Sequence, residues 1–432
     1  MKNIQIIISI VFGIFILIGV FVFAGLIPSP KTILQKSTAG KVVVWGATDS
    51  ILMNDLIQRQ ITSKYPDLSV KYSEHPADTF ANDLIEALAS GTGPDLVLLP
   101  GDLIVRFSSK VEPFSPTTYP ERTFRDTFIE EGELFISPKQ GVLALPFTID
   151  PMVMYWNRDM FSAGNIARPP GYWDEFLTLA PILSKRNETN GIAKSAIAFG
   201  EFRNVTHAKD ILALLIMQTG NPISILGEGA ILPTLSGIPP RNIPPADEAV
   251  RFYTDFADPE KSIYSWNRSL PESKNAFLSQ DLAVYFGYAS ELRDIRTKNP
   301  NLNFDVARVP QVRDLPFKNT YGKMVGVAVM KASVNKPGAF FTAQLLTAPE
   351  FNKGVSDALH LPPTQRALLA KAPSDPFMKV FYDSALVSKS WFDANPEKTS
   401  DIFQTVIDSI IAGKVRVRGA VERAQAELLL IK

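Results

Sequence analysis

A single carboxylate stands inside one of the most apolar stretches of the chain. Asp150 lies within LALPFTIDPMVMYWNRDMF, which we expect to form a strand that breaks at Asp150-Pro151 and then resumes. A carboxylate in an apolar strand is costly to bury unless it is paired or faces a cleft. Asp150 is therefore the first candidate for a contact with a bound ligand.

Hydrogen-bonding side chains also follow the first predicted strand. Thr48, Asp49 and Ser50 come directly after Lys41–Gly46 (KVVVWG), a β-branched run typical of a buried strand. Their hydroxyl and carboxylate groups could bond to a polyol. Alternatively, Asp49 or Ser50 simply caps the helix that follows. Both interpretations stay open.

Motifs of the common enzyme classes do not occur in the chain. There is no Walker loop, dinucleotide glycine fingerprint, HExxH or GxSxG sequence. His75, His207 and His360 lie in different segments and none is paired at metal-ligand spacing. We therefore expect no metal and no cofactor. Two carboxylates acting on a glycan stay an alternative, because their separation in space is not fixed by sequence spacing.

The elements that must position these side chains alternate between strand and helix. From Lys41 to Leu99 the pattern is strand, helix, strand, helix and strand, which favours a mostly parallel sheet with helices on its faces. After Gly141 strand-like and helical runs alternate again, so we expect a second α/β lobe. A length of 432 residues is also more typical of two domains than of one core.

An uncharged apolar run, Ile6–Ile27, opens the chain and reaches the roughly 20 residues that a membrane-spanning helix needs. With Lys2 retained inside, the rest of the chain would lie on the extracytoplasmic face. There is no cysteine to form a disulfide or to carry a lipid. We therefore expect a cell-membrane protein with a single-pass N-terminal anchor. Secretion after signal-peptide cleavage behind Val22-Phe23-Ala24 is the alternative.

Seven segments, taken in order, carry a family resemblance. They are KVVVWGATDS at Lys41, GTGPDLVLL at Gly91, LPFTIDPMVMYWNRDMF at Leu145, PPGYWDEF at Pro169, FLSQDLAVYFGYAS at Phe277, VARVPQ at Val306 and AFFTAQLLTAPEF at Ala339. In this order the chain resembles the extracellular solute-binding proteins of ABC importers, in the group that includes the maltose-binding protein. The resemblance implies two α/β lobes joined by crossing strands, with a ligand cleft that closes like a hinge.

The resemblance also implies how the chain divides. Residues 1–30 are expected to be the anchor or signal sequence, and residues 31–40 a linker. Residues 41–148 and 312–360 would form the N-terminal lobe, and residues 149–311 and 361–432 the C-terminal lobe.

The same resemblance implies a set of ligand-binding residues. Three of them are aromatic, because an aromatic ring stacks on the apolar face of a sugar, although each of these rings could instead be buried in a core. The polar candidates lie after strands or on the first crossing between lobes. The full set is Thr48, Asp49, Ser50, Asp102, Asp150, Asn204, Trp266, Tyr288 and Trp391.

The function implied is capture of a small polar ligand, a sugar or oligosaccharide, and its delivery to ABC transporter permease subunits. No catalysis is expected. A surface-anchored sensor or a glycan-acting enzyme is the alternative. Acidic and basic residues balance at 44 each, so there is no basic field for nucleic acid. We expect a monomer that meets the membrane through its N-terminal helix.

Overall fold

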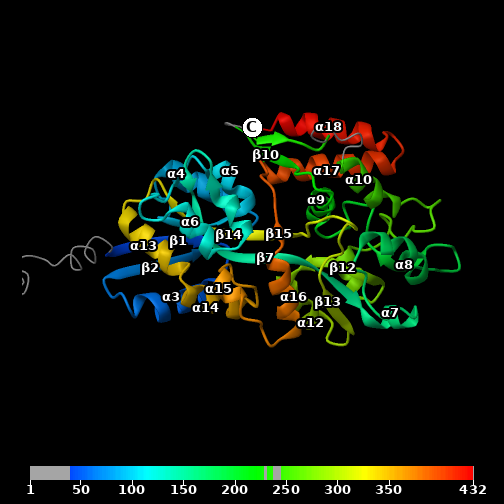
Figure 1. Ribbon diagram of the computed structural model, residues 1–432, viewed down its shortest axis with the longest axis horizontal. Coiled ribbons are helices and arrows are strands. Elements are labelled where there is room, and N and C mark those ends of the chain that lie inside the picture. Colours follow the sequence, from blue (N-terminus) through cyan, green and yellow to red (C-terminus); the bar gives the residue numbers. More distant parts are fainter. Residues whose placement is uncertain (1–38, 228–230, 237–244, 432) are drawn as a thin grey trace, which may run out of the picture. The chain divides into compact units, whose positions relative to one another are not determined.

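The computed structural model describes residues 39–227, 231–236 and 245–431 (Figure 1). These residues divide into two compact units. The first unit comprises residues 39–97 and 332–345, and the second comprises residues 98–331 and 346–431. These bounds differ from those of the two lobes expected from the sequence, which stay a prediction. The expected membrane anchor, and the expected linker up to residue 38, lie outside the described residues.

The first unit is built on a parallel sheet. β1 (Gly40–Gly46) pairs in parallel with β2 (Leu68–Glu74) and with β3 (Leu96–Pro100). Helices α3 (Ser50–Ile57) and α4 (Phe80–Ser90) connect these strands in turn. The strand and helix order predicted for this part of the chain is confirmed.

The second unit has two long strands at its centre. β14 (Thr320–Met330) and β7 (Ala144–Asn157) are antiparallel. β7 pairs next with β12 (Leu282–Tyr288), which pairs with β9 (Ile192–Ile197). Shorter strands extend this sheet or form separate hairpins. The remaining strands of the unit are β4 (Val111–Glu112), β5 (Ile136–Ser137), β6 (Gly141–Val142), β8 (Lys185–Arg186), β9 (Ile192–Ile197), β10 (Ser224–Leu226), β11 (Ile231–Pro233), β12 (Leu282–Tyr288), β13 (Phe304–Ala307) and β15 (Ser388–Lys389).

Helices pack around these strands, and α17 (Pro396–Ile411) and α18 (Val417–Leu429) lie side by side (Figure 1). Helix α13 (Lys336–Leu346) leads from the first unit back to the second. The helices of the second unit are α5 (Ile104–Phe107), α6 (Glu121–Thr127), α7 (Arg158–Ala163), α8 (Phe176–Leu183), α9 (Ala208–Gln218), α10 (Pro245–Asp255), α11 (Ser273–Leu278), α12 (Leu292–Lys298), α14 (Pro349–Leu359), α15 (Arg366–Leu369), α16 (Pro376–Ala385), α17 (Pro396–Ile411) and α18 (Val417–Leu429).

Strand β7 corrects one expectation from the sequence. It runs without a break through Asp150-Pro151, where we expected an interruption. The strand continues because it changes partners there. It pairs with β14 up to Pro151 and with β12 from Met152 onward, so the missing N–H of proline falls at the changeover. Asp150 is thereby fixed beside the point where three strands meet.

An aromatic core fills the second unit. Phe199 is fully buried and packs against Trp173, Tyr253 and Phe286, with ring centroids 4.9 to 5.8 Å apart. Such tilted arrangements are those that aromatic side chains favour. This core holds β9 and β12 against the helices that cover them, and so it fixes the strand ends from which site residues project.

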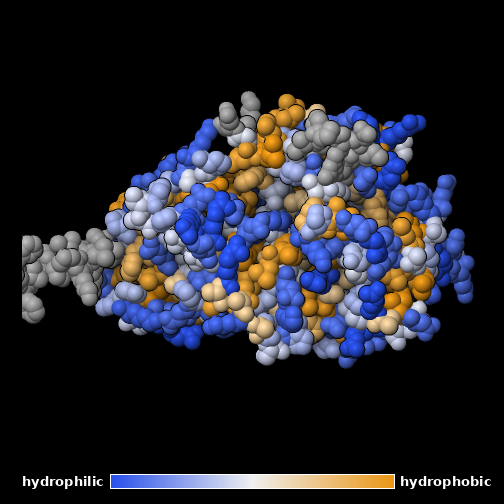
Figure 2. Space-filling view, viewed as in Figure 1, coloured by the Kyte–Doolittle hydropathy of each residue, from blue (hydrophilic) through white to orange (hydrophobic). Residues whose placement is uncertain are grey.

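Polar residues cover much of the face shown in Figure 2, with apolar residues between them. Among the described residues, no helix combines the length and the apolar character that crossing a membrane requires.

Candidate functional site

Lys323 and Asp150 face each other across two strands. They are register partners in the antiparallel pair of β14 and β7, so their side chains project on the same face. Asp150 Oδ1 also accepts a hydrogen bond of 3.1 Å from the backbone N–H of Ser290. Burial raises the pKa of Asp150 to about 6, although this hydrogen bond and the charge of Lys323 act against the rise. The carboxyl group is therefore ionised at neutral pH but titrates close to it.

Asp210 links Lys323 to an aromatic ring. Its Oδ2 accepts a hydrogen bond of 2.6 Å from the hydroxyl of Tyr288 and lies 3.2 Å from Lys323 Nζ. The Lys323 ammonium group lies 4.1 Å from the centre of the Tyr288 ring, a favourable cation–π contact. Burial alone would raise the pKa of Asp210, but Lys323 and Tyr288 outweigh it and hold the pKa below its ordinary value. Asp210 is thus a permanent anion that orients both neighbours.

A second acidic residue, Glu291, fixes the turn after β12. Its Oε1 accepts a hydrogen bond of 2.8 Å from the Tyr288 backbone N–H and lies 2.7 Å from His207 Nε2. Burial opposes ionisation, but His207 and the other partners lower the pKa of Glu291 to about 2. His207 has a φ of +62°, which non-glycine residues seldom adopt. This network holds the Ser290 N–H in place for Asp150.

Another ion pair lies at the start of α9. Lys209 Nζ is 2.5 Å from Asp393 Oδ2 and 5.8 Å from the centre of the Trp391 ring. Trp391 is 6% exposed and stacks on Phe403 at 6.3 Å. Its Nε1 is buried and has no hydrogen-bond partner in the described part of the chain. A buried indole N–H normally has a partner, so this donor is available to an acceptor that reaches it.

Asp102 lies near both ion pairs. It belongs to the 3₁₀ turn Gly101–Leu103 that follows β3, and its side chain is exposed to solvent. Even so, displacement of surrounding water raises its pKa, while the charge of Lys209 opposes the rise. Lys323 and Asp210 also act on it electrostatically. Asp102 is thus exposed to solvent and close enough to both ion pairs to feel their charges.

Helix α9 explains how two of these charges are held. Lys209 and Asp210 occupy its first turn, and the eight residues that follow, Ile211–Gln218, are all buried. Because the apolar helix is anchored in the core, its charged first turn cannot move independently. The positive end of the helix dipole also favours a carboxylate at Asp210. We call six of these residues the central polar cluster: Asp102, Asp150, Lys209, Asp210, Tyr288 and Lys323.

Four of the residues expected to bind ligand come together in or beside this cluster. Asp102, Asp150 and Tyr288 belong to it, and Trp391 contacts Lys209. They come from four separate segments of the second unit. Their grouping agrees with the expectation that they share a site, although contact with a ligand stays a prediction.

Asn204 and Trp266 have structural contacts instead. Trp266 is 1% exposed, and its Nε1 donates a hydrogen bond of 3.2 Å to Asn204 Oδ1. Asn204 Nδ2 donates to the carbonyl groups of Asn267 at 2.9 Å and Leu270 at 3.0 Å. The indole face is therefore covered, and both amide hydrogens of Asn204 are used. The structure favours burial in the core for Trp266 and a loop-fixing role for Asn204.

Thr48, Asp49 and Ser50 lie in the first unit. Asp49 Oδ1 accepts a hydrogen bond of 2.8 Å from the Leu52 N–H and caps α3, as one of the two interpretations expected. The backbone N–H of Thr48 donates to the Tyr72 hydroxyl at 2.9 Å. Ser50 N–H donates to a carboxylate oxygen of Glu74 at 2.8 Å. A role for these three residues in ligand binding stays a prediction.

Sequence reasoning missed Lys209, Asp210 and Lys323. A signal was nevertheless present for each, because they are isolated charges in apolar elements. The helix AKDILALLIMQ carries both of its charges in its first turn, and Lys323 is the only charge in the strand TYGKMVGVAVM. The same argument that selected Asp150 would have selected these three residues.

The central polar cluster offers fixed hydrogen-bond donors and acceptors beside an aromatic ring. This arrangement suits a ligand that carries several hydroxyl groups, since carboxylates accept and ammonium groups donate hydrogen bonds to them. Within residues 39–227, 231–236 and 245–431, no group of three histidine, cysteine, aspartate or glutamate side chains is placed to hold a metal ion.

The chain belongs to the family of bacterial extracellular solute-binding proteins, whose family model matches residues 49–353. A curated relative, a binding protein of Brucella abortus strain 2308, is 23% identical over 293 residues. The match spans 66% of this chain and 66% of the length of that relative.

Solved structures show the same fold. An ABC transporter solute-binding protein of Thermotoga lettingae, bound to α-D-tagatose, is 19% identical with a TM-score of 0.66, over 91% of this chain and 100% of that chain. The cyclic α-maltosyl-1,6-maltose binding protein of Arthrobacter globiformis is 15% identical with a TM-score of 0.73, over 91% and 99%. The predicted α/β fold of two-lobed solute-binding proteins is confirmed.

Proposed function

We propose that the chain is an extracytoplasmic solute-binding protein that captures a sugar or oligosaccharide and delivers it to the permease subunits of an ABC transporter. Membership of the solute-binding family supports the binding role. The likeness to proteins described with tagatose or named as maltose-type binders supports a sugar as the ligand. No catalytic step is part of the proposal.

The observation that carries the proposal is the grouping of two carboxylates, Asp150 and Asp210, around Lys323 beside the Tyr288 ring. Asp102 and Asp150 would accept hydrogen bonds from ligand hydroxyl groups, and Lys209 and Lys323 would donate them. Three of these side chains, Asp150, Lys209 and Lys323, already have hydrogen-bond or ion-pair partners in the protein. A ligand that contacts them would therefore displace solvent and would not bury an unpaired charge. The cost of desolvating a bare charge is thereby avoided.

The aromatic residues would contribute in different ways. Tyr288 is 3% exposed and carries Lys323 over its ring, so we propose that it mainly orients Asp210 and Lys323. Trp391 would offer its unpartnered Nε1–H to a ligand oxygen. Thr48, Asp49 and Ser50 stay in the proposal as residues of the other predicted lobe. Ligand contacts from both lobes would favour a closed form over an open one.

The proposal places the chain at the cell membrane. Ile6–Ile27 would be a single-pass anchor that keeps the binding domain on the extracytoplasmic face, and signal-peptide cleavage is the alternative. The mass of the chain purified from membranes separates the two. A full-length mass supports the anchor, and a mass that lacks the first 24 or more residues would rule it out.

Thermal unfolding against a ligand panel tests the function. The panel would hold tagatose, maltotriose and maltotetraose, with amino acids and polyamines as other solute classes. A ligand at 100 times its dissociation constant adds about 2.7 kcal/mol to the free energy of unfolding. We expect a saturable rise in the unfolding midpoint with one class of sugar, and the sugar should be recovered unchanged. A rise only with amino acids or polyamines would contradict the proposal.

A further inference from the structure

One cavity of the second unit has only cations among its charged lining residues, whereas the central polar cluster combines carboxylates with lysines. It has a volume of about 290 Å³ and is lined by residues of four segments: 169–172, 307–311, 318–320 and 384–387. Its lining contains two cations, Arg308 and Lys318, and no acidic residue. By contrast, two carboxylates of the central polar cluster have raised pKa values because they have lost water.

The side chains of the two cations of this cavity have no ion-pair partner among the described residues. Neither Arg308 nor Lys318 makes an ion pair or a side-chain hydrogen bond within the described ranges, and both are exposed. Arg313, a few residues away, shows the alternative, because its Nε lies 2.8 Å from Asp174 Oδ2. The local sequence therefore supplies a carboxylate partner for one arginine and leaves the two cations of the cavity without one.

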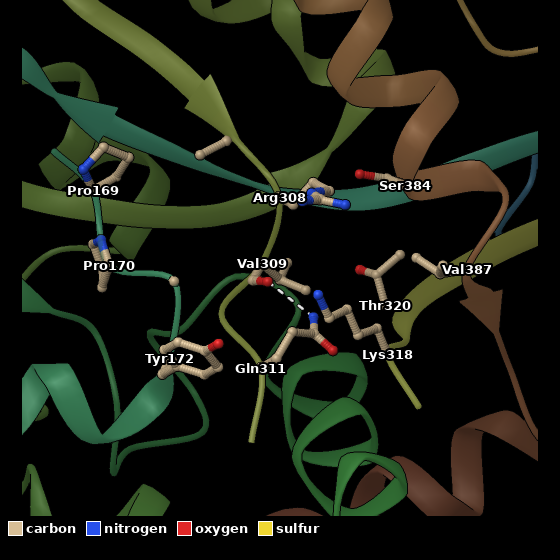
Figure 3. Close-up of a pocket in the computed structure, with 12 residues that line it drawn as sticks. Pro169, Pro170, Tyr172, Arg308, Val309, Gln311, Lys318, Thr320, Ser384 and Val387 are labelled. Carbon is tan, nitrogen blue, oxygen red and sulfur yellow. Dashed lines mark hydrogen bonds between the residues drawn. The ribbon is translucent and has the colours of Figure 1, made fainter. Parts of the chain in front are cut away.

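A buried hydroxyl group faces the same space. Ser384, in the last turn of α16, is 1% exposed, and its Oγ has no hydrogen-bond partner in the part of the chain that the structure describes. Figure 3 shows the Ser384 hydroxyl directed toward Arg308, with Lys318 and Thr320 across the cavity. A buried polar group without a partner is uncommon in folded proteins. Ser384 therefore indicates an acceptor that is supplied from outside the chain.

The wall of the cavity is already built. Gln311 Nε2 donates to the carbonyl group of Val309 at 3.0 Å (Figure 3). It donates also to the carbonyl group of Asn319 at 3.0 Å. Gln311 N–H donates to the Gly171 carbonyl at 3.0 Å, which ties the 169–172 loop to this segment. Thr320 Oγ1 donates to the carbonyl of Met152 at 2.7 Å. Because these donors are occupied, Arg308, Lys318 and Ser384, with the Tyr172 hydroxyl, are the side-chain groups left to bind a ligand.

We propose that this cavity binds a small organic anion through one carboxylate or phosphate group. Arg308 and Lys318 would neutralise the charge, and Ser384 Oγ would donate a hydrogen bond to one of its oxygens. Proline and valine side chains line the rest of the wall and suit a small apolar body. The volume lies at the lower end of the range for ligand pockets, which excludes a large ligand. This site is independent of the sugar site.

Calorimetric titration of the full chain in a nonionic detergent tests the inference. The probes are inorganic phosphate, glycerol 3-phosphate and benzoate, with glycerol as the uncharged control for the two phosphates and benzyl alcohol as that for benzoate. We expect at least one of the three anions to bind, its uncharged counterpart not to bind, and the affinity to fall as salt is added. Binding of phosphates without benzoate, or the reverse, identifies which anionic group the site accepts.

Substitutions locate the binding. Arg308→Gln and Lys318→Gln should each weaken anion binding about tenfold, since each removes a charge-assisted hydrogen bond. Lys414→Gln, an exposed lysine outside the cavity, is the matched control and should leave it unchanged. Sugar binding should be the same in all three variants, so failure of this inference can be told from failure of the proposed function. The inference is overturned if none of the three anions binds at a concentration of about 10 mM. It is also overturned if Arg308→Gln and Lys318→Gln bind the anion as tightly as the unaltered chain does.

Discussion

Glu131 is a buried carboxyl group that should make the protein less stable as pH rises. It lies in the 3₁₀ segment Glu130–Phe135 and is 5% exposed, and the Ser390 hydroxyl donates a hydrogen bond to its Oε1. Burial raises the pKa of Glu131 from 4.5 to about 8, against the opposing effects of Ser390 and Lys389. The folded protein therefore retains a proton that the unfolded chain releases.

The sign and size of the effect follow from that difference. Below pH 4.5 both states are protonated, and Glu131 contributes no pH dependence. Between pH 4.5 and about 8 the folded state binds more protons, so the free energy of unfolding falls as pH rises. Each pKa unit corresponds to about 1.4 kcal/mol, which gives roughly 3 to 4 kcal/mol between pH 5 and pH 8.

Urea unfolding of the unaltered chain and of Glu131→Gln at four pH values would measure this effect. Glutamine cannot ionise, so the variant should gain roughly 3 to 4 kcal/mol relative to the unaltered chain from pH 5 to pH 8. Glu130→Gln is the matched control. Glu130 is exposed and paired with Lys389, whose hydrogen bond holds the pKa of Glu130 below its usual value, so it does not titrate in this range. Parallel curves for Glu131→Gln and the unaltered chain would refute the reasoning.

Three further predictions concern the site and its supports. Asp150→Asn should flatten the pH dependence of sugar affinity, which in the unaltered chain should rise with a midpoint near pH 6 because the carboxylate is the better acceptor; a rise that persists in the variant, measured by calorimetry, would count against a ligand contact. Asn204→Ala leaves the buried Trp266 N–H without its partner, so it should lower the free energy of unfolding by about 1 to 3 kcal/mol; the same urea midpoint as the unaltered chain would contradict a loop-fixing role. Gly200→Ala places a Cβ in collision with that of Ala257, at a φ of +96° that alanine seldom adopts, so we expect a clear loss of thermal stability. An unchanged unfolding midpoint would contradict this expectation.

Elements with a local signature were predictable from the sequence. The run KVVVWG forms β1, and its two β-branched core residues Val42 and Val44 are fully buried. Helix α4 ends at Ser90, where Gly91 has a φ of +72° that glycine adopts without strain. Such features depend on neighbouring residues alone, so composition and spacing reveal them.

The pairing of charges was not predictable, because it depends on segments far apart in the chain. Lys323 meets Asp210, and Lys209 meets Asp393, only after two strands and α9 have packed together. Asp150 was found because a lone carboxylate in an apolar strand needs a reason. Pro151, however, wrongly predicted a break, since its neighbours do not show that β7 changes partners there.

Aromatic residues were the least predictable part of the site. Trp266 lies in a polar stretch, Tyr264-Ser265-Trp266-Asn267, yet it is buried against an amide group 62 residues away. Tyr288 lies in the central polar cluster, where its hydroxyl group donates a hydrogen bond to Asp210, and its contact with a ligand stays a prediction. Whether an aromatic ring faces a ligand or a core is decided by packing, and the sequence does not show the packing partners.

The central claim is that the central polar cluster binds a sugar, and calorimetric titration of the chain with maltotriose, maltotetraose and tagatose tests it most directly. Asp150→Asn would be titrated beside Asp401→Asn, an exposed aspartate outside the cluster that serves as the matched control. We predict saturable binding of at least one sugar to the unaltered chain and to Asp401→Asn, with affinity at least about tenfold lower in Asp150→Asn. Equal affinity in all three proteins would contradict the assignment of the site, and no binding of any sugar would contradict the proposed function itself.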